Sequence, residues 1–193
     1  MSVAAIILAA GSSQRLGQPK QNVLLAGETL LQRAIRNAVD ADLSPIVVVV
    51  HGSIHSDAFA SQPAVQFVIN PNPGEGIASS IRCGIAGLVC EEVAGAVVMT
   101  CDQPAVNSTH LRALASDELR VTGSRYSRTL GVPAYFPKGS FAELGKLSGD
   151  SGARSLLQAA HSISAENLEL DIDTQQDLDR ARALFESKAH EAS

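Results

Sequence analysis

Tryptophan is absent from this sequence of 193 residues, and aromatic residues make up only 4% of it. Valine, isoleucine, leucine and alanine must therefore fill the core, and hydrophobic residues, at 45%, are numerous enough to build a sizeable one. Excess positive charge is also lacking, because the formal net charge is -5. That balance argues against a surface that coats nucleic acid, so local cations would have to bind any anionic ligand.

Cysteine and long apolar runs are scarce as well. Cys83, Cys90 and Cys101 are odd in number and have no C-x-x-C spacing, so we interpret them as buried apolar residues in a reducing compartment. None of the five histidines has metal-ligand spacing with a cysteine. The first apolar run, residues 3–10, is too short to span a bilayer and follows no basic segment typical of a secretory signal. We expect a cytoplasmic protein without a membrane partner.

Apolar runs alternate with segments of helical spacing. Strands are predicted at residues 3–9, 46–50, 65–69, 95–99 and 168–172, with a short or edge strand at Tyr135 and Phe136. Helices are predicted at residues 30–39, 77–89, 109–115 (capped by Ser108), 141–146, 154–160 and, after a Thr174 cap, to residue 184. This alternation predicts an α/β fold, a doubly wound and mostly parallel twisted sheet.

A loop rich in small residues follows the first predicted strand. Gly11 lacks a Cβ, so backbone N–H groups there can approach a phosphate closely. Arg15 and Lys20 add positive charge for a polyanion. The spacing is neither that of a P-loop nor that of a G-x-G-x-x-G fingerprint. The loop indicates a nucleotide phosphate site, with an ordinary strand-to-helix turn as the alternative.

Carboxylates also occur after two of the predicted strands, where α/β folds commonly bind ligands. Asp102 follows the strand at residues 95–99, where it could hold Mg²⁺, although an Asp that begins a turn before Pro104 is a common alternative. By strand alternation, Asp171 and Asp173 share one face, but Asp173 could also cap the last helix. Ser79 and Ser80 begin a helix after a glycine-containing turn, either to cap it or to contact a ligand.

Several of these segments resemble the MobA-like NTP transferase family. Its signature L-A-[AG]-G-x-S-x-R-x-G-x-x-K is matched by Leu8, Ala9, Ala10, Gly11, Ser13, Arg15, Gly17 and Lys20. Residues 170–178 are similar to its D-I-D-T-x-x-D-L segment, and residues 131–136 and 147–154 to G-x-P-x-x-F and L-x-G-D-x-G-A-R. The resemblance implies a Rossmann-like nucleotidyltransferase fold in one domain, residues 1–193. Residues 1–119 would bind the nucleotide, and residues 120–193 would form a small C-terminal acceptor-binding subregion.

The resemblance also implies roles for individual residues, with Mg²⁺ as the cofactor. Those roles are catalytic for Arg15, Lys20 and Asp102, nucleotide-binding for Leu8, Ala9, Ala10, Gly11, Ser79 and Ser80, acceptor-binding for Pro133, Asp150 and Arg154, and metal-binding for Asp102 and Asp173. Asp171 would support the metal site. On residue chemistry alone, Asp150 or Ser151 could instead cap the helix that follows, which leaves the role of Asp150 open.

The implied reaction is transfer of CMP from CTP to the terminal phosphate of molybdopterin, with release of pyrophosphate. Ala10, where the guanylyl branch usually has glycine, and the run Asp102-Gln103-Pro104 favour CTP over GTP. Val132 stands where many relatives have histidine, a departure on the acceptor side. The alternatives are guanylyl transfer, a sugar-phosphate or other small-molecule nucleotidyltransferase, and a non-catalytic chaperone for the molybdenum cofactor. In any of the functions that use molybdopterin, the protein could also make a transient contact with a molybdoenzyme or its chaperone.

Overall fold

The computed structural model describes residues 1–11, 13, 15–52, 65–127, 129–165 and 168–191. Within these residues the strands are β1 (Ser2–Ala9), β2 (Leu24–Leu25), β3 (Glu28–Thr29), β4 (Ile46–Val50), β5 (Val65–Ile69), β6 (Val93–Thr100), β7 (Thr122–Tyr126), β8 (Thr129–Pro137) and β9 (His161–Ser164). The α-helices are α1 (Leu30–Asp40), α2 (Ile77–Ala86), α3 (Ser108–Leu114), α4 (Phe141–Leu144), α5 (Arg154–Leu157) and α6 (Gln175–Glu191). Short 3-10 turns are η1 (Lys20–Asn22), η3 (Pro73–Glu75), η4 (Lys138–Ser140) and η5 (Gly149–Ser151).

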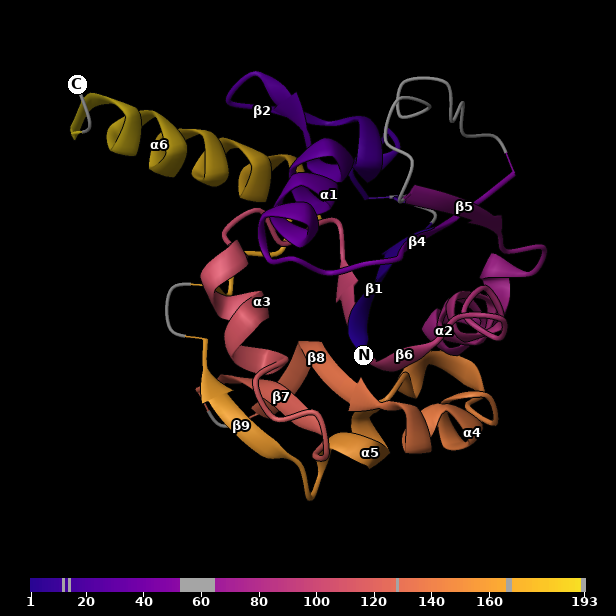
Figure 1. Ribbon diagram of the computed structural model, residues 1–193. Coiled ribbons are helices and arrows are strands. Elements are labelled where there is room, and N and C mark those ends of the chain that lie inside the picture. Colours follow the sequence, from indigo (N-terminus) through magenta and orange to yellow (C-terminus); the bar gives the residue numbers. More distant parts are fainter. Residues whose placement is uncertain (12, 14, 53–64, 128, 166–167, 192–193) are drawn as a thin grey trace.

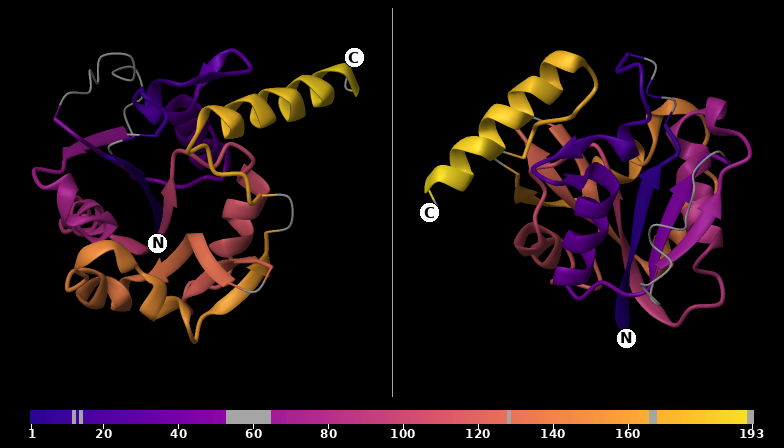
Figure 2. Two further views of the ribbon diagram at one scale, coloured as in Figure 1. Left: turned by 180° about the vertical axis from the view of Figure 1, so that it is seen from behind. Right: turned by 90° about the horizontal axis from the view of Figure 1, so that it is seen from above.

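One sheet runs through the molecule in the order β5-β4-β1-β6-β8-β7-β9 (Figure 1). The pairs β5–β4, β4–β1, β1–β6 and β7–β9 are parallel, whereas β8 is antiparallel to both of its neighbours. Helices α1 and α3 pack on one face, and α2, α4 and α5 pack on the other (Figures 1 and 2). The prediction of a doubly wound, mostly parallel α/β sheet is confirmed.

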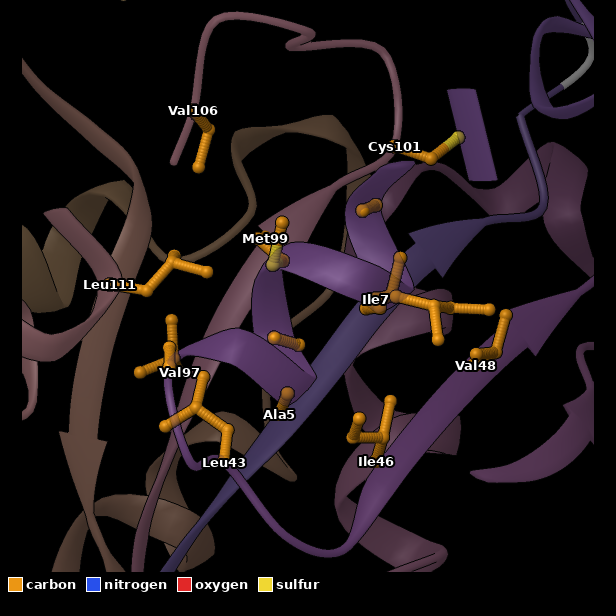
Figure 3. Packing of buried hydrophobic residues seen from close by; sticks show 14 of the residues in the cluster. Ala5, Ile7, Leu43, Ile46, Val48, Val97, Met99, Cys101, Val106 and Leu111 are labelled. Atoms are coloured by element: carbon orange, nitrogen blue, oxygen red, sulfur yellow. The ribbon is translucent and has the colours of Figure 1, made fainter. Parts of the chain in front are cut away.

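The central strand β1 is buried on both faces because its residues alternate between two core clusters. Ala5 and Ile7 pack with Val48, Val97 and Met99 beneath α1 and α3 (Figure 3). On the other face, Ile6 packs beneath α2. Gly84 lets α2 come this close, since a Cβ there would lie 2.4 Å from Cγ2 of Ile6. Continuous apolar runs such as β1 and β4 are what a doubly covered parallel sheet requires.

Two helix starts show how local hydrogen bonds set the boundaries. Thr29 and Gln32 form a capping box at the start of α1. Helix α3 begins after Asn107, whose Oδ1 accepts from the His110 N–H at 2.9 Å. The predicted Ser108 cap is therefore wrong by one residue. Asn107 has the extended backbone of a cap, whereas Ser108 already lies in the helix.

The C-terminal part of the sheet differs most from the prediction. The pair Tyr135 and Phe136 belongs to β8, an interior strand between β6 and β7, so the edge assignment is wrong. Residues 168–172 form no strand, and the last strand is β9 instead. Leu168 and Ile172 are buried, but the segment crosses the end of the sheet, and the Ile172 N–H donates to the Asp102 carbonyl at 3.0 Å. The alternation of apolar residues in this segment therefore reflects burial of Leu168 and Ile172 and not pairing with a neighbouring strand.

Helix lengths also depart from the predicted ones. Helices α2, α4 and α5 end at Ala86, Leu144 and Leu157, in two cases with a glycine as the C-terminal cap. Helix α6 instead continues to Glu191, past the predicted end at residue 184, and projects from the body of the molecule (Figure 1). In the described part of the chain, no helix combines the length and apolarity needed to span a membrane.

Candidate functional site

A cavity, called the first cavity below, lies where β1 and β6 end. From β1 the sheet grows through β4 and β5 on one side, and from β6 it grows in the opposite direction. Open α/β sheets bind ligands at this place because the connections diverge to opposite sides there. The volume of the first cavity is about 440 Å³. It is lined by Leu8, Ala9, Ala10, Gly11, Ser13, Arg15, Lys20, Gln21, Pro73, Gly76, Ile77, Ser80, Thr100, Cys101, Asp102, Asp150 and Asp173.

The loop after β1 is closed by its own hydrogen bonds. Ser13 Oγ accepts from the Lys20 backbone N–H at 3.0 Å, and Gly17 turns the chain with a φ of +72°. Arg15 is exposed on this loop and forms no ion pair with any described residue. A Cβ built at Gly11 would meet no described atom within 4 Å. Packing within the described residues therefore does not demand glycine at this position, and Gly11 lines the first cavity.

Three charged side chains from distant parts of the sequence meet on the floor of the first cavity. Lys20 Nζ donates to Asp102 Oδ2 at 2.8 Å and also to Asp173 Oδ1. The first of these ion pairs is largely shielded, with exposed side-chain fractions of 16% for Lys20 and 20% for Asp102. The Ile172–Asp102 backbone bond brings Asp173 to this point.

A third hydrophobic cluster fixes the loop after β1 against the C-terminal segment. It contains Leu16, Val23, Leu25, Leu30, Ile172, Leu178 and Ala181. Thr174 and Asp177 then begin α6 with reciprocal bonds, in which Asp177 Oδ2 accepts from the Thr174 N–H at 2.8 Å. The positions of Lys20 and Asp173 thus follow from packing on either side of them.

The charged groups of the first cavity and the neighbouring Asp171 perturb one another. Burial acts to lower the pKa of Lys20, but the Asp102 and Asp173 carboxylates outweigh it, and the net pKa lies above the usual 10.5. Partial burial, together with the negative charge of Asp102, raises the pKa of Asp171 to about 6. Burial also raises the pKa of the Cys101 thiol, which keeps this lining residue uncharged.

Two carboxylates that converge on one cation form a donor set suitable for a hard metal ion. Among the described residues no group of three or more His, Cys, Asp or Glu side chains is placed to hold a metal. Mg²⁺, however, is commonly held by one or two carboxylates plus substrate phosphates and waters. Asp102 and Asp173 fit that pattern, since both reach the single position of Lys20 Nζ.

The start of α2 forms the opposite wall of the first cavity. Ser79 and Ser80 lie in the first turn of α2, as predicted. Both are buried, and Ser80 lines the cavity. Gly76 precedes them with a φ of +104°, and a Cβ there would lie 2.2 Å from Asp150 Oδ1. Asn70, which no sequence pattern singled out, follows β5 and donates to both serine hydroxyls.

A second cavity of about 1030 Å³ lies next to the first and shares Ile77 and Asp150 with it. Its walls come from α2, β7, β8, η5, α5 and the segment before α6: Ile77, Ile81, Gln103, Arg125, Tyr126, Ser127, Thr129, Leu130, Gly131, Val132, Asp150, Gly152, Ala153, Arg154, Leu157, Gln158, Ala160, Glu169 and Asp171. Of the predicted acceptor residues, Asp150 and Arg154 line this cavity. Pro133 is buried and does not.

Tyr126 lines the second cavity but was missed from the sequence, and Gln103, which the sequence linked to nucleotide preference, lines this cavity beside it. Tyr126 Oη donates to the Val132 carbonyl at 2.7 Å, and Gln103 Nε2 lies 3.4 Å from Tyr126 Oη. Strand β7 was not predicted, so nothing marked Tyr126. Asp150 does not cap α5, because that helix has no side-chain cap. The carboxylate of Asp150 instead lies at the boundary between the two cavities.

Comparison with known proteins agrees with this architecture. The family model for the MobA-like NTP transferase domain matches residues 5–165. The purine catabolism protein PucB of Bacillus subtilis is 29% identical over 92% of this chain and 94% of its own length. A probable molybdenum cofactor guanylyltransferase of Bacillus cytotoxicus is 32% identical over 58% of this chain and 55% of its own.

Solved structures extend the similarity to the fold. The crystal structure of Rv0371c from Mycobacterium tuberculosis superposes with a TM-score of 0.80 and 27% identity, over 95% of this chain and 99% of that one. A second structure of that protein, in complex with manganese, has a TM-score of 0.75 and 24% identity over 95% and 98% of the two chains. From the family match and the sheet topology together, the chain belongs to the MobA-like NTP transferase family and is a nucleotidyltransferase.

Proposed function

We propose that this protein transfers CMP from CTP to the terminal phosphate of molybdopterin. An oxygen of the acceptor phosphate attacks the α-phosphorus of CTP in line, the bond from that phosphorus to the β-phosphate oxygen breaks, and pyrophosphate leaves. The observation that carries the proposal is the meeting of Lys20, Asp102 and Asp173 beside the loop after β1. Lys20 could bind the phosphates of a nucleoside triphosphate, and the two carboxylates could bind its metal ion. The uncrowded backbone at Gly11 lies in the adjoining loop.

Catalysis would consist of positioning and charge neutralisation. We assign Arg15 and Lys20 to the triphosphate, and Asp102 and Asp173 to Mg²⁺. When bound, the metal ion would neutralise charge on the phosphates. Lys20 would exchange part of its contact with the carboxylates for a phosphate oxygen, and its raised pKa keeps it cationic at neutral pH. The acceptor phosphate is already anionic, so the attack needs no strong general base.

The nucleobase would lie between the end of β1 and the start of α2. We assign Leu8, Ala9, Ala10 and Gly11 to one side of it, and Ser79 and Ser80 to the other. Ala10 is buried and lines the first cavity, so its methyl group takes up space that a glycine would leave open. We propose that this narrowing favours the smaller pyrimidine.

The second cavity would receive the acceptor. It opens into the region beside Asp150, which supports attack from that side on a nucleotide in the first cavity. Arg154 offers a cation there, whereas buried Pro133 would act only through the shape of β8. Residues 120–193 would carry the acceptor and residues 1–119 the nucleotide, although Asp173 crosses over to the first cavity.

Of the three cysteines predicted to be buried, only Cys101 is; Cys83 is half-buried and Cys90 is exposed, so burial was wrong for those two. All three are free thiols, which accords with the cytoplasmic location that we propose.

Guanylyl transfer to the same cofactor is the second candidate. Two curated relatives are named probable molybdenum cofactor guanylyltransferases, and each matches over about half of the chain. Ala10 and Gln103 favour CTP over GTP by resemblance to the cytidylyl branch. A cofactor chaperone without catalysis would have no use for the assembled group of Lys20 and two carboxylates.

The test is pyrophosphate release with each of the four NTPs, Mg²⁺ and molybdopterin, together with thermal shifts for each NTP. We expect release with CTP and a higher melting temperature in its presence, because ligand binding to the native state stabilises it. Release with GTP alone would replace cytidylyl by guanylyl transfer. If no nucleotide raised the melting temperature or released pyrophosphate, the nucleotidyl-transfer function would be refuted.

A further inference from the structure

Granted the nucleotide site proposed above, on which this assignment rests, we propose that Asn70 is a positioning residue that sets base preference. It holds the hydroxyl of Ser80 as a hydrogen-bond donor toward the nucleobase. Asn70 lies outside both cavities and is 1% exposed, so it would act through Ser80 and not by contact with the ligand.

The backbone N–H and both side-chain amide groups of Asn70 are engaged. Its backbone N–H donates to the Val50 carbonyl at 2.8 Å, which fastens it to the end of β4. Its side-chain Oδ1 accepts from the Asn72 backbone N–H at 2.9 Å. Its Nδ2 donates to Ser79 Oγ at 2.8 Å and to Ser80 Oγ at 2.9 Å. Both amide hydrogens are therefore used, one on each serine.

The orientation of this amide follows from its surroundings. A backbone N–H can only donate, so the Asn70 atom that faces the Asn72 N–H must be the oxygen. The nitrogen must then face the two serines, because an amide carries one oxygen and one NH₂ group. Each serine hydroxyl consequently accepts a hydrogen bond from Asn70.

The two hydroxyls differ in where their own protons go. Ser79 Oγ lies 2.8 Å from the Gly76 carbonyl and 3.0 Å from the Asn72 carbonyl, and its proton is spent there. No described residue accepts a hydrogen bond from Ser80 Oγ, and Ser80 lines the first cavity. With its acceptor side occupied by Asn70, Ser80 has one proton left to donate into the cavity.

A donor at this wall discriminates between bases. Cytosine presents two neighbouring acceptors, O2 and N3, beside its N4–H₂ donor, whereas guanine presents two neighbouring donors, N1–H and N2–H₂, beside its O6 acceptor. A hydroxyl fixed as a donor matches O2 or N3 of cytosine and opposes N1–H or N2–H₂ of guanine, and a mismatch leaves buried polar groups unpaired. The arrangement of Asn70 and Ser80 therefore favours a cytosine-type edge.

Asn70→Asp reverses this arrangement with almost no change of shape. The carboxylate can still accept from the Asn72 N–H, but it has no hydrogen to give to Ser80. The free proton of Ser80 would then turn toward the carboxylate, and its lone pairs would face the cavity. The hydroxyl becomes an acceptor, which suits the donor edge of guanine.

Calorimetric titration with CTP and with GTP, each with Mg²⁺, tests the proposal on four proteins: wild type, Asn70→Asp, Ser80→Ala and the double variant. We expect Asn70→Asp to shift the ratio of the two affinities toward GTP by at least about tenfold, the equivalent of one hydrogen bond. Ser80→Ala should weaken CTP binding more than GTP binding. In the Ser80→Ala background, Asn70→Asp should leave the ratio unchanged.

Asn37→Asp is the matched control, since Asn37 is also buried and its Nδ2 donates to the Val106 carbonyl at 2.7 Å, outside both cavities. It should lower the melting temperature without moving the affinity ratio. Equal weakening of both nucleotides by Asn70→Asp, or the same shift without the Ser80 hydroxyl, would overturn the proposal. If Asn70→Asp does not fold, Ser80→Ala serves as the test. The same ratio of CTP to GTP affinity in Ser80→Ala as in wild type would then overturn the proposal.

The wild-type result separates this proposal from the proposed function. A wild-type preference for GTP would refute cytidylyl transfer, yet a shift of Asn70→Asp still further toward GTP would support the role of Asn70. Absence of binding by either nucleotide would overturn both.

Discussion

Replacing Asp102 by asparagine separates its role in turnover from its role in stability. The change keeps the shape of the side chain but removes the charge that would bind Mg²⁺. We expect turnover to fall at least about 100-fold, the loss seen when a preorganised charge at a reacting centre is removed. Pyrophosphate release with CTP, Mg²⁺ and molybdopterin measures this effect.

The stability cost of Asp102→Asn should be much smaller. The lost interaction is a 2.8 Å ion pair between side chains that are 16% and 20% exposed. Hydrogen bonds to charged groups contribute roughly 1.5–3 kcal/mol, but an asparagine oxygen still accepts from Lys20, which also keeps Asp173. Removing the negative charge of Asp102 also relieves its repulsion of Asp171. A net loss of about 1 kcal/mol would lower the melting temperature by about 2–4 °C.

Thermal unfolding by circular dichroism measures that shift beside the activity assay. Asp117→Asn is the matched control, because Asp117 forms a surface ion pair with Arg120 at 3.4 Å and lines neither cavity. The control should keep both wild-type turnover and melting temperature. Turnover of Asp102→Asn within tenfold of wild type, or an inactive variant that has unfolded, would refute the reasoning.

Three further predictions use the same assays. Lys20→Ala should slow pyrophosphate release by at least about tenfold, more than its melting temperature accounts for, because the lost phosphate contact is charge-assisted; an inactive variant that has merely unfolded would contradict this. Ala10→Gly should relax the preference for CTP in competition with GTP at equal concentration, and an unchanged preference would remove Ala10 from base selection. Burial lowers the pKa of His110 below 6.5 in the folded protein. As pH drops below about 6.5, His110 is therefore protonated more in the unfolded chain than in the folded one, and the free energy of unfolding should fall. The variant His110→Gln should lose this part of the pH dependence in urea titrations, whereas an equal slope in both proteins would exclude His110 as its source.

Much of the sheet could be predicted because its parallel strands are continuous apolar runs. The runs that became β1 and β4 carry their signal in local sequence, and burial on both faces leaves few alternatives for such segments. The same holds for the loop after β1, where small residues and cations recur at fixed spacing. These features depend on neighbours in the chain.

Features that depend on distant partners were harder to predict. Strand β7, with the run Thr-Gly-Ser-Arg-Tyr, has no apolar alternation, and it becomes a strand because β8 and β9 flank it. The segment 168–172 has the alternation of a strand but crosses the sheet end, because Ile172 packs in the cluster beneath the loop after β1. Asn70 carried no local signal of its role, since its hydrogen bonds depend on how α2 returns against β5.

The meeting of Lys20 with Asp173 spans 153 residues of sequence. During synthesis on the ribosome, the loop after β1 and Asp102 would emerge well before the segment that completes the group. A chain that is still growing, or one cut before residue 172, would have the loop after β1 and the Asp102 carboxylate without that of Asp173. Catalytic competence should therefore appear last, after the whole sheet has assembled, which makes pyrophosphate release a stringent reporter of complete folding.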